Sequence, residues 1–576
     1  MSYLADLRRE IDFLVFDWLG EDDRETGSAV LDLSERLAGD VFAPHYRMGD
    51  TQEPQLIDGR VRVLEESKRA IASYAELGLF GASFAPAIGG MGLSQTMSSA
   101  SYLLFGAANL STAAYIMLTA ANARVLAAFG MPEQVEFFAR PEIEGRWLGT
   151  MCLSEPNAGS SLADITTQAV PEGEDALGCR YRLFGHKMWI SGGEQDASEN
   201  IVHLVLAKAV GPEGVVKPGT AGISLFVVPR ILPDGTENDV IVAGLNHKLG
   251  YRGIPNCALN FGEGAVEPHG SAGAVGWRIG AEGDGLRQMF QMMNEARIGV
   301  SLGAAAVGYR AFRQSLTYAG DRVQGKGAEG GQNSGNVAII DHPDVQRMLT
   351  QQKYYTEGAL ALTLYAARLA DQGEEHLLGL LTPIVKSWSS VWTLRANDLA
   401  IQIHGGYGYT RDFDVELLWR DNRLNPIHEG TNGIQAIDLL DRKLLRGNGV
   451  ALTALKSRIA ETAARAAAYG EIASLAPLLL EAWSRIEAII EDARGLERRR
   501  MLFNASPFLD AMGHVVVAWL LLDQLLAGGG QDSAYLRGKR RACALFFITE
   551  LPLIEAWLAP LRGVCAVALT AAADEY

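Results

Sequence analysis

The sequence predicts an α+β protein of several domains: an N-terminal helical domain, a central β-barrel, a C-terminal four-helix bundle and an additional C-terminal helical domain. Three observations lead to this fold class. The 576 residues are enough for roughly three or four domains of ordinary size. The spacing of apolar residues changes from helical to strand-like around Trp147 and becomes helical again from Gly285. Helical spacing then continues to the C-terminus, beyond the residues that one bundle needs.

Residues 1–146 are predicted to be the N-terminal helical domain. Leu4, Leu7 and Ile11 recur at helical spacing. The stretch Ser98–Phe129 is rich in alanine and almost uncharged. A helix without a charged face is usually buried on most sides, so this stretch predicts a pair of buried helices.

Residues 147–275 are predicted to be a β-domain. Its segments are short, rich in β-branched and aromatic residues, and bounded by Gly, Pro, Asn or Asp. They are Tyr181–Phe184, Lys187–Ser191, Ile201–Ala207, Ile223–Val228, Val240–Ala243 and Asn256–Phe261. Gly185-His186, between the first two, predicts a tight hairpin turn. The pattern is typical of a barrel or a sandwich, and we predict a barrel.

Residues 276–448 are predicted to be a four-helix bundle, because three long helical stretches and a shorter one after Thr431 suit that fold. The long stretches are Asn294–Arg322, Asp344–Asp371 and Leu381–His404. Residues 325–336 consist mainly of glycine and polar residues, which predicts a flexible loop. Residues 449–576 are predicted to be a further helical domain, alanine-rich at first and then strongly apolar.

The composition excludes several classes of partner. The formal net charge of -17 argues against a nucleic acid or an anionic membrane, which bind broad basic faces. A small phosphate-bearing ligand stays open, since it needs only a few arginines and N–H groups. The five cysteines lack CxxC spacing, which predicts a reducing compartment and no metal site. The chain starts without a signal-peptide pattern and the apolar run Val515–Leu522 is too short to span a bilayer, so we expect a cytoplasmic protein.

The stretch Ala400–Ala436 contains the strongest candidate for catalysis. It has a glycine-broken loop at His404–Tyr409 and a lone acid, Glu429, between His428 and Gly430-Thr431. Glycine lets another molecule approach the backbone closely, so the carboxylate can act as a general base and its N–H can bind a substrate oxygen. The alternative is a surface glutamate that caps the following helix, and this segment alone does not decide between them.

Two strand ends offer candidate ligand contacts. Met151–Ser161 (MCLSEPNAGSS) carries hydroxyls and N–H groups that suit a polar planar ligand or a phosphate. Lys187–Gly193 (KMWISGG) places an indole where it can stack on a ring. Taken singly, each segment is more typical of an ordinary turn, because glycine and serine are the usual turn residues.

Together, five segments resemble the flavin-dependent acyl-CoA dehydrogenases. They are CLSEPNAGSS, KMWISGG, the run from Arg322 to Gly325, QIHGGYG from Gln402 and IHEGT from Ile427, in the family's order. The α–β–α layout agrees, and the resemblance covers residues from about 30 to 445. The C-terminal block and the segment HEGTNGIQ from His428 resemble the subgroup of longer chains in this family. That subgroup includes 3-(methylthio)propionyl-CoA dehydrogenases and broad-range fatty acyl-CoA dehydrogenases.

The resemblance implies that Glu429 is the catalytic base. It would remove the α-proton of an acyl-CoA thioester while the β-hydrogen leaves as a hydride to N5 of FAD, giving trans-2-enoyl-CoA. The Glu429 backbone N–H and a ribityl hydroxyl would hold the thioester carbonyl. Some relatives carry the base on another helix, where this chain has Ala296. Its neighbour Glu295 faces about 100° round the helix and is expected to be solvated or ion-paired, and His428 is expected to pack.

The resemblance also implies the binding residues. Those expected to contact FAD are Leu153, Ser154, Trp189 and Ser191 at the flavin ring, Thr431, and Arg322, Gln402, Gly405 and Gly406 across a subunit interface. Those expected near the substrate are Ser160, Arg297 and Gly430. An ion pair inside the bundle explains Arg297 equally well.

The implied electron acceptor is an electron-transfer flavoprotein, and we expect a homodimer. Three alternatives stay open. An acyl-CoA oxidase would use the same base but let oxygen reach the flavin. A nitroalkane-oxidase-like enzyme is disfavoured because that branch has Asp at the position of Glu429. A DNA-binding relative of the fold would need a basic surface, for which the net charge of -17 gives no support.

Overall fold

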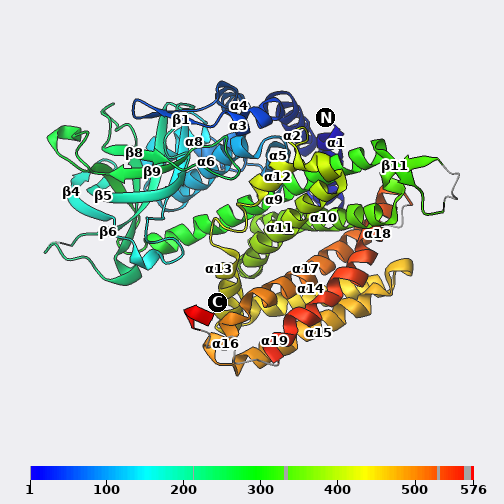
Figure 1. Cartoon of the computed structure of the whole chain (residues 1–576). Coiled ribbons are helices and arrows are strands. Elements are labelled where there is room, and N and C mark those ends of the chain that lie inside the picture. Colours follow the sequence, from blue (N-terminus) through cyan, green and yellow to red (C-terminus); the bar gives the residue numbers. More distant parts are fainter. Residues whose placement is uncertain (1, 212, 330–334, 529–531, 563–571, 576) are drawn as a thin grey trace. The chain divides into compact units, whose positions relative to one another are not determined.

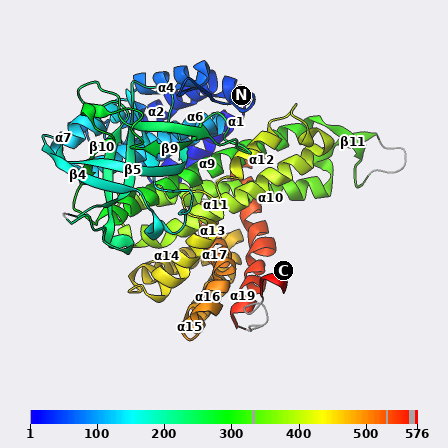
Figure 2. The same cartoon turned by 60° about the vertical axis from the view of Figure 1, so that its left-hand side comes forward.

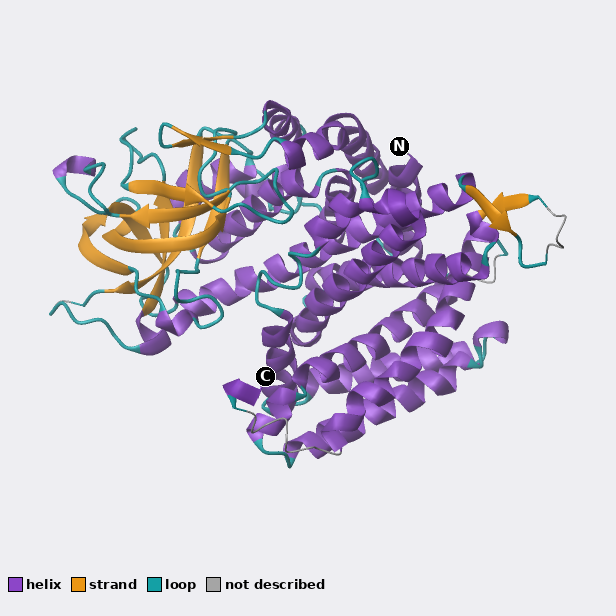
Figure 3. Cartoon of the chain, in the orientation of Figure 1, coloured by secondary structure: helices purple, strands orange, loops and turns teal. Residues whose placement is uncertain are grey.

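The computed structural model describes residues 2–211, 213–329, 335–528, 532–562 and 572–575 (Figure 1). The chain divides into two compact units. Unit 1 contains Met1–Asp32, Ser99–Ala107 and Val300–Tyr576, and unit 2 contains Leu33–Ser98 and Ala108–Gly299. The main β-sheet belongs to unit 2, and most of the long helices belong to unit 1 (Figure 3). The four domains predicted from the sequence are a finer division, which stays a prediction.

Unit 2 is built around an eight-stranded, mostly antiparallel sheet. Its strands are β3 (Trp147–Cys152), β4 (Gln168–Asp175), β5 (Gly178–Ser191), β6 (Asn200–Ala209), β7 (Ile223–Pro229), β8 (Val240–Leu245), β9 (Asn256–Phe261) and β10 (Ala274–Ile279). The hydrogen-bonded order is β10-β7-β6-β4-β5-β9-β8, and β3 pairs with β6 in parallel. The predicted segments from Ile201 onward lie in β6, β7, β8 and β9, so these four predictions are confirmed.

A closed barrel, as predicted, is not confirmed. β10 pairs with both β7 and β5, so the sheet wraps, but β3 and β8 each pair with one neighbour among the described strands. The cause is the length of β5, which changes partners along its course. Its first half pairs with β4 and β10, and its second half pairs with β9, which carries β8 as an extension of the sheet.

The predicted hairpin turn at Gly185-His186 is wrong. Both residues lie inside β5, where Gly185 pairs with Phe261 and His186 pairs with Asn260. The glycine is required by close packing, because a Cβ at this position would lie 2.4 Å from Oγ1 of Thr167. A glycine between two strand-like segments marks here a close approach of the backbone and not a reversal of the chain.

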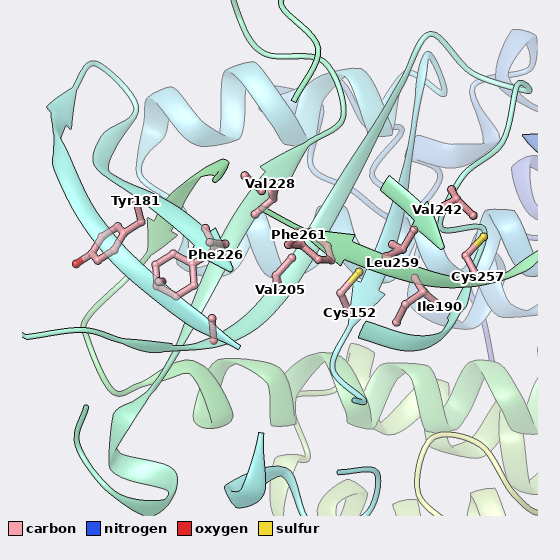
Figure 4. Packing of buried hydrophobic residues seen from close by; sticks show 14 of the residues in the cluster. Cys152, Tyr181, Ile190, Val205, Phe226, Val228, Val242, Cys257, Leu259 and Phe261 are labelled. Atoms are coloured by element: carbon pink, nitrogen blue, oxygen red, sulfur yellow. The ribbon is translucent and has the colours of Figure 1, made fainter. Parts of the chain in front are cut away.

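One hydrophobic core lies between the strands of unit 2 (Figure 4). Val205 and Phe226 come from the neighbouring strands β6 and β7, and Leu259 and Phe261 come from β9. Burying a side chain of this size contributes about 1.5–3 kcal/mol. Since a slip of one residue would turn each of these side chains to the opposite face, this core fixes the register of the strands and with it the loops at their ends.

The other elements of unit 2 are helices and one hairpin. They are α3 (Tyr46–Thr51), α4 (Glu65–Glu76), α6 (Leu110–Phe129), α7 (Pro132–Gln134), α8 (Arg140–Ile143), β1 (Gln55–Ile57) and β2 (Arg60–Arg62), while α2 (Arg24–Leu37), α5 (Gln95–Ala108) and α9 (Gly285–Asp321) have residues in both units. α5 and α6 are largely buried, as their almost uncharged sequence predicts. The hairpin is absent from the prediction. Asp58 and Gly59 at its turn both have positive φ, as Asp-Gly turns require.

The long helices match the predicted ones. They are α9 (Gly285–Asp321), α10 (Pro343–Asp371) and α11 (Glu375–His404), followed by the shorter α12 (Val415–Asn422) and α13 (Asn432–Ile437). A hydrogen bond joins α9 to α11, where Ser301 Oγ donates to the Val385 carbonyl (2.8 Å). The predicted loop 325–336 overlaps two short strands, since its first two residues lie in β11 (Val323–Lys326) and its last residue begins β12 (Asn336–Ala338). Its residues 330–334 lie outside the described residues.

The C-terminal block is helical throughout its described residues. Its helices are α14 (Val450–Ala467), α15 (Leu475–Arg494), α16 (Arg498–Phe503), α17 (Ala505–Ala527), α18 (Ala534–Leu545) and α19 (Ile554–Arg562). α14, α15 and α19 pack against α17 (Figures 1 and 2). The prediction of a further helical block after residue 449 is confirmed for these residues.

Three stretches of the described chain are long and apolar enough to cross a membrane, judged by length and composition alone. They are Leu110–Phe129, Ala505–Ala527 and Ala534–Arg562. The argument that Val515–Leu522 is too short to span a bilayer is therefore wrong, because this run lies inside the 23-residue helix α17. Within α17, 83% of the apolar window is buried inside the protein, against 44% for the third stretch. That no membrane is bound stays a prediction.

A buried group of charges joins α1 (Ser2–Asp12) to the C-terminal block within unit 1. Lys539 on α18 donates to Glu10 on α1 (2.5 Å) and to Glu357 on α10 (3.3 Å). Its third partner is the amide oxygen of Gln524 on α17 (3.0 Å). All four side chains are buried. Burial alone would lower the pKa of Lys539, but the two carboxylates outweigh it and raise that pKa.

Lys539→Met should lower the free energy of unfolding by about 3–5 kcal/mol, because Glu10 and Glu357 then lose the ammonium that they share. Arg537→Met on the same helix is the control, since its ion pair with Asp532 is exposed and contributes less than about 1 kcal/mol. Urea unfolding monitored by circular dichroism measures both. An equal, small effect of the two changes would contradict the stabilising role of the cluster.

Candidate active site

The loop between α12 and α13 holds Glu429 in an uncommon backbone conformation. The chain leaves α12 through a turn in which the N–H groups of Ile427 and His428 both donate to the Leu424 carbonyl (2.8 and 3.2 Å). Glu429 then has φ +53° and Gly430 has φ +84°. The left-handed region costs a residue with a side chain roughly 1–2 kcal/mol. The surrounding loop must therefore hold Glu429 in place.

α13 is capped by Thr431, so the helix cap does not explain Glu429. The Oγ1 of Thr431 accepts a hydrogen bond from the N–H of Ile434 (3.4 Å). The Glu429 side chain is half-buried, whereas Thr431 is exposed. The alternative of a surface glutamate that caps the helix thereby loses its support, and the role of general base stays a prediction.

A chain of buried amides ends at His428. The side-chain amide of Asn397 donates to the Val307 carbonyl (3.3 Å), Asn422 donates to Asn397 (2.5 Å) and Asn425 donates to Asn422 (2.9 Å). Nε2 of His428 lies 3.1 Å from the amide oxygen of Asn425. Because the NH₂ group of Asn425 donates to Asn422, its oxygen faces the imidazole, and the network assigns the ring proton to Nε2.

His428 is neutral in this environment. Burial lowers its pKa to about 3, and the Lys386 ammonium acts in the same direction. Lys386 on α11 is fully buried and donates to the side-chain oxygen of Asn432, the first residue of α13 (3.0 Å). His428 and Lys386 therefore act as anchors of the loop on either side of Glu429, in line with the packing role expected for His428.

Unit 1 also brings Arg322 next to the glycine-broken loop. This loop is the short 3₁₀ helix Gly405–Tyr409 at the end of α11, and the N–H of Gly405 donates to the Gln402 carbonyl. The Arg322 guanidinium lies 5.9 Å from the centre of the Tyr407 ring. A Cβ at Gly405 or Gly406 would meet nothing within 4 Å, so the space beside this backbone is open. Arg322 and Gln402 are exposed.

In unit 2, the ends of β3 and β5 lie together. The N–H of Met188 donates to the Ser154 carbonyl (3.0 Å), and Nζ of Lys187 donates to the Leu153 carbonyl (3.1 Å). Because C=O and N–H point in opposite directions in a trans peptide, the Ser154 N–H faces away from Lys187. The side chains of Leu153 and Ser154 are half-buried.

A buried ion pair fixes these two strand ends. Nζ of Lys187 lies 2.9 Å from the Glu155 carboxylate, and both side chains are buried. Glu155 also accepts hydrogen bonds from the backbone N–H and the hydroxyl of Thr166 and of Thr167. Burial alone would raise the pKa of Glu155, but the Lys187 ammonium and the threonine donors outweigh it and lower that pKa to about 2. This pair is not among the predicted contacts. The signal in the sequence that indicates it is a single charged residue in each of two motifs that consist mainly of small or apolar residues.

Trp189 is 62% exposed and has φ +67°, although it lies within β5. An exposed indole held in a left-handed backbone is suited to stack on a planar ring. Ser191 ends β5, and its hydroxyl accepts a hydrogen bond from the Asn256 side chain (3.4 Å). The four residues predicted at the flavin ring therefore lie on two strand ends that a hydrogen bond joins.

The remaining predicted residues lie elsewhere in unit 2. Ser160 is exposed in the loop after β3. Arg297 on α9 is buried and donates to the side chain of Asn294 (3.2 Å). Glu295 pairs with Arg124 (2.6 Å), so the expectation of an ion-paired residue is confirmed. Burial raises the pKa of Glu295 in spite of this arginine.

Three family models match the chain. The acyl-CoA dehydrogenase middle domain matches residues 150–263, and the acyl-CoA dehydrogenase C-terminal domain matches residues 283–445. The model described as acetyl-CoA dehydrogenase C-terminal like matches residues 455–571. The first match includes both strand ends of unit 2, and the second includes Arg322, the glycine-broken loop and Glu429.

Relatives match almost the whole chain. The 3-methylmercaptopropionyl-CoA dehydrogenase of Ruegeria pomeroyi is 34% identical, over 91% of this chain and 90% of that protein. The broad-specificity linear acyl-CoA dehydrogenase FadE5 of Mycobacterium tuberculosis is 30% identical, over 96% of each. The structure of an acyl-CoA dehydrogenase from Bacillus anthracis complexed with FAD is 20% identical, covering 97% of this chain and 92% of its own, with a TM-score of 0.76. The chain belongs to the acyl-CoA dehydrogenase family and is an oxidoreductase.

Proposed function

We propose that this chain is an FAD-dependent acyl-CoA dehydrogenase that converts an acyl-CoA thioester to the trans-2-enoyl-CoA, with Glu429 as the base. The observation that carries the proposal is the left-handed backbone of Glu429 in a loop anchored on both sides. Thr431 supplies the helix cap, so the cap does not account for the glutamate. An uncommon backbone conformation that the fold maintains is typical of a residue positioned for function.

Each unit has residues that suit one part of FAD. An isoalloxazine needs a flat apolar partner and hydrogen-bond donors, which Trp189 and Ser154 offer at the strand ends of unit 2. A pyrophosphate suits an exposed guanidinium beside a backbone without side chains, as at Arg322 and Gly405-Gly406. The other proposed contacts are Leu153, Ser191, Gln402 and Thr431.

The chain's own groups would carry the proton chemistry. Bound FAD would supply the acceptor for the hydride from the β-carbon. The Glu429 carboxylate would take the α-proton of the thioester. The backbone N–H of Glu429 would hydrogen-bond the thioester oxygen and stabilise the charge that develops there, a donor worth about 3 kcal/mol. Gly430 would let the thioester approach the backbone, and Ser160 and Arg297 would lie near the CoA portion.

The substrate is proposed to be 3-(methylthio)propionyl-CoA or a fatty acyl-CoA, in line with the names of the two relatives. The proposed electron acceptor is an electron-transfer flavoprotein, and the proposed assembly is a cytoplasmic homodimer. Values of kcat/KM for acyl-CoAs of increasing chain length, with the methylthio compound among them, would separate the substrates. Peroxide formed in proportion to substrate, without an added acceptor, would identify an acyl-CoA oxidase instead.

Glu429→Gln should lower kcat by roughly 10²–10⁴-fold, because the amide keeps the size of the side chain but cannot accept the proton. The purified variant should stay yellow and fail to bleach when acyl-CoA is added. Glu295→Gln is the control, since its carboxylate pairs with Arg124 and is expected to leave most of the activity. Full activity of the Glu429 variant would refute the assignment of the base.

Lys187→Met should weaken FAD binding, because the Leu153 carbonyl and Glu155 lose the ammonium that holds the two strand ends together. The expected result is a higher Kd of the apoprotein for FAD, measured by quenching of flavin fluorescence, and a lower melting temperature. Lys208→Met on strand β6, which β4 separates from β5, should change neither by a comparable amount. Unchanged FAD affinity in Lys187→Met would show that the ion pair does not position the ends of β3 and β5 for FAD binding.

Glu155→Gln should make stability less dependent on pH in acid. The pKa of Glu155 is about 2 in the fold and ordinarily 4.5, so the charged form stabilises the fold above pH 4.5. That stabilisation, about 3 kcal/mol, is lost as the pH falls from 4.5 towards 2. Urea unfolding at several pH values should show the free-energy difference between wild type and variant shrinking over this range. A difference independent of pH would contradict the lowered pKa.

A further inference from the structure

The side-chain amide of Gln435 holds the two backbone carbonyls that follow the Cα of Glu429. Gln435 lies on α13 and is fully buried. Its Nε2 donates to the carbonyl oxygen of Glu429 (3.1 Å) and to that of Gly430 (3.3 Å). A Cβ on Gly430 would lie 2.8 Å from this nitrogen, so the amide packs directly against the glycine.

These two hydrogen bonds set the directions of the peptide groups. In a trans peptide the C=O and the N–H point in opposite directions. The bond to the Glu429 carbonyl therefore turns the Gly430 N–H away from Gln435, and the bond to the Gly430 carbonyl does the same for the Thr431 N–H. Rotation of either peptide plane would break a hydrogen bond of a buried amide, which is costly.

The loop is also anchored on the N-terminal side of Glu429. His428 is tied to the amide chain through Asn425, and Lys386 holds Asn432 at the start of α13. Glu429 thus lies between two anchored positions, and its φ of +53° cannot relax while both hold. Gln435 contacts the backbone of Glu429 itself.

We propose that Gln435 is a positioning residue for the base Glu429, whose backbone it holds left-handed so that the carboxylate stays in reach of the α-proton. The inference rests on the proposed function of Glu429. A residue that only stabilises the fold would change the melting temperature alone. A positioning residue changes kcat more than KM, because displacing a reacting group by about 1 Å costs roughly 10²-fold in rate.

Gln435→Met tests this, because methionine is close to glutamine in size and has no donor. Gln352→Met is the matched control. Gln352 on α10 is also fully buried, and its Nε2 donates to the Ser315 hydroxyl (3.2 Å) and the Ala396 carbonyl (2.8 Å). Each variant therefore loses two hydrogen bonds of a buried amide. The measurements are the melting temperature, flavin absorbance per chain, kcat, KM, and the pH profile of kcat/KM.

Both variants should melt at lower temperature and retain flavin. Gln435→Met should lower kcat at least about tenfold with a KM within about threefold of wild type, and should shift the acidic limb of the pH profile. Gln352→Met should keep kcat within about twofold, with an unchanged pH profile. A Gln435→Met enzyme with the kcat of the control would overturn the proposal.

The activity of Glu429→Gln separates a failure of the proposed function from a failure of the positioning role alone. If Glu429→Gln retains full activity, the proposed function itself fails. If Glu429→Gln is inactive while Gln435→Met keeps its kcat and pH profile, the positioning role alone fails. Should Gln435→Met not fold, Gln435→Asn and Gln352→Asn replace the pair, since asparagine keeps the donor on a side chain too short for both carbonyls. The same split in kcat is then expected.

Discussion

A glutamate held in a left-handed backbone is the constraint on which the proposed site depends. Glycine would adopt the φ of Glu429 without a steric penalty, whereas a residue with a Cβ adopts it at a cost of roughly 1–2 kcal/mol. The fold nevertheless carries a side chain there and surrounds it with anchors from α11, from the turn after α12 and from α13. The proposed role of the carboxylate as a base would account for this arrangement, since Thr431 supplies the helix cap.

Periodicity predicted the long helices and strands β6 to β9, because each buries one face or both faces in a continuous core. It failed where burial and local sequence disagree. β4 is exposed at almost every position and carries four charged or proline residues, so its strand pairing comes from β5 and β6 and not from its own pattern. The local sequence at Gly185 predicts a turn, whereas close packing against Thr167 is what requires a glycine there.

The residues of the candidate site also differ in whether the local sequence predicts them. Glu429, Arg322 and Trp189 could be predicted because each lies in a contiguous motif with a recognisable spacing. Lys187 and Gln435 could not, since their roles arise only when a strand or a helix is folded against a loop. In both cases a buried polar side chain turns backbone carbonyls towards itself, which decides where the N–H groups of the loop point.

The ammonium shared by Glu10 and Glu357 comes from the C-terminal block. Trimming the chain after residue 448, to the length of a protein without this block, would therefore remove the ammonium that Glu10 and Glu357 share. Glu357 would keep its ion pair with Lys353 on α10, whereas Glu10 would lose Lys539. Helices α1 and α18 are thus electrostatically interdependent, so an exchange of either helix between homologues would have to preserve the charge of its partner.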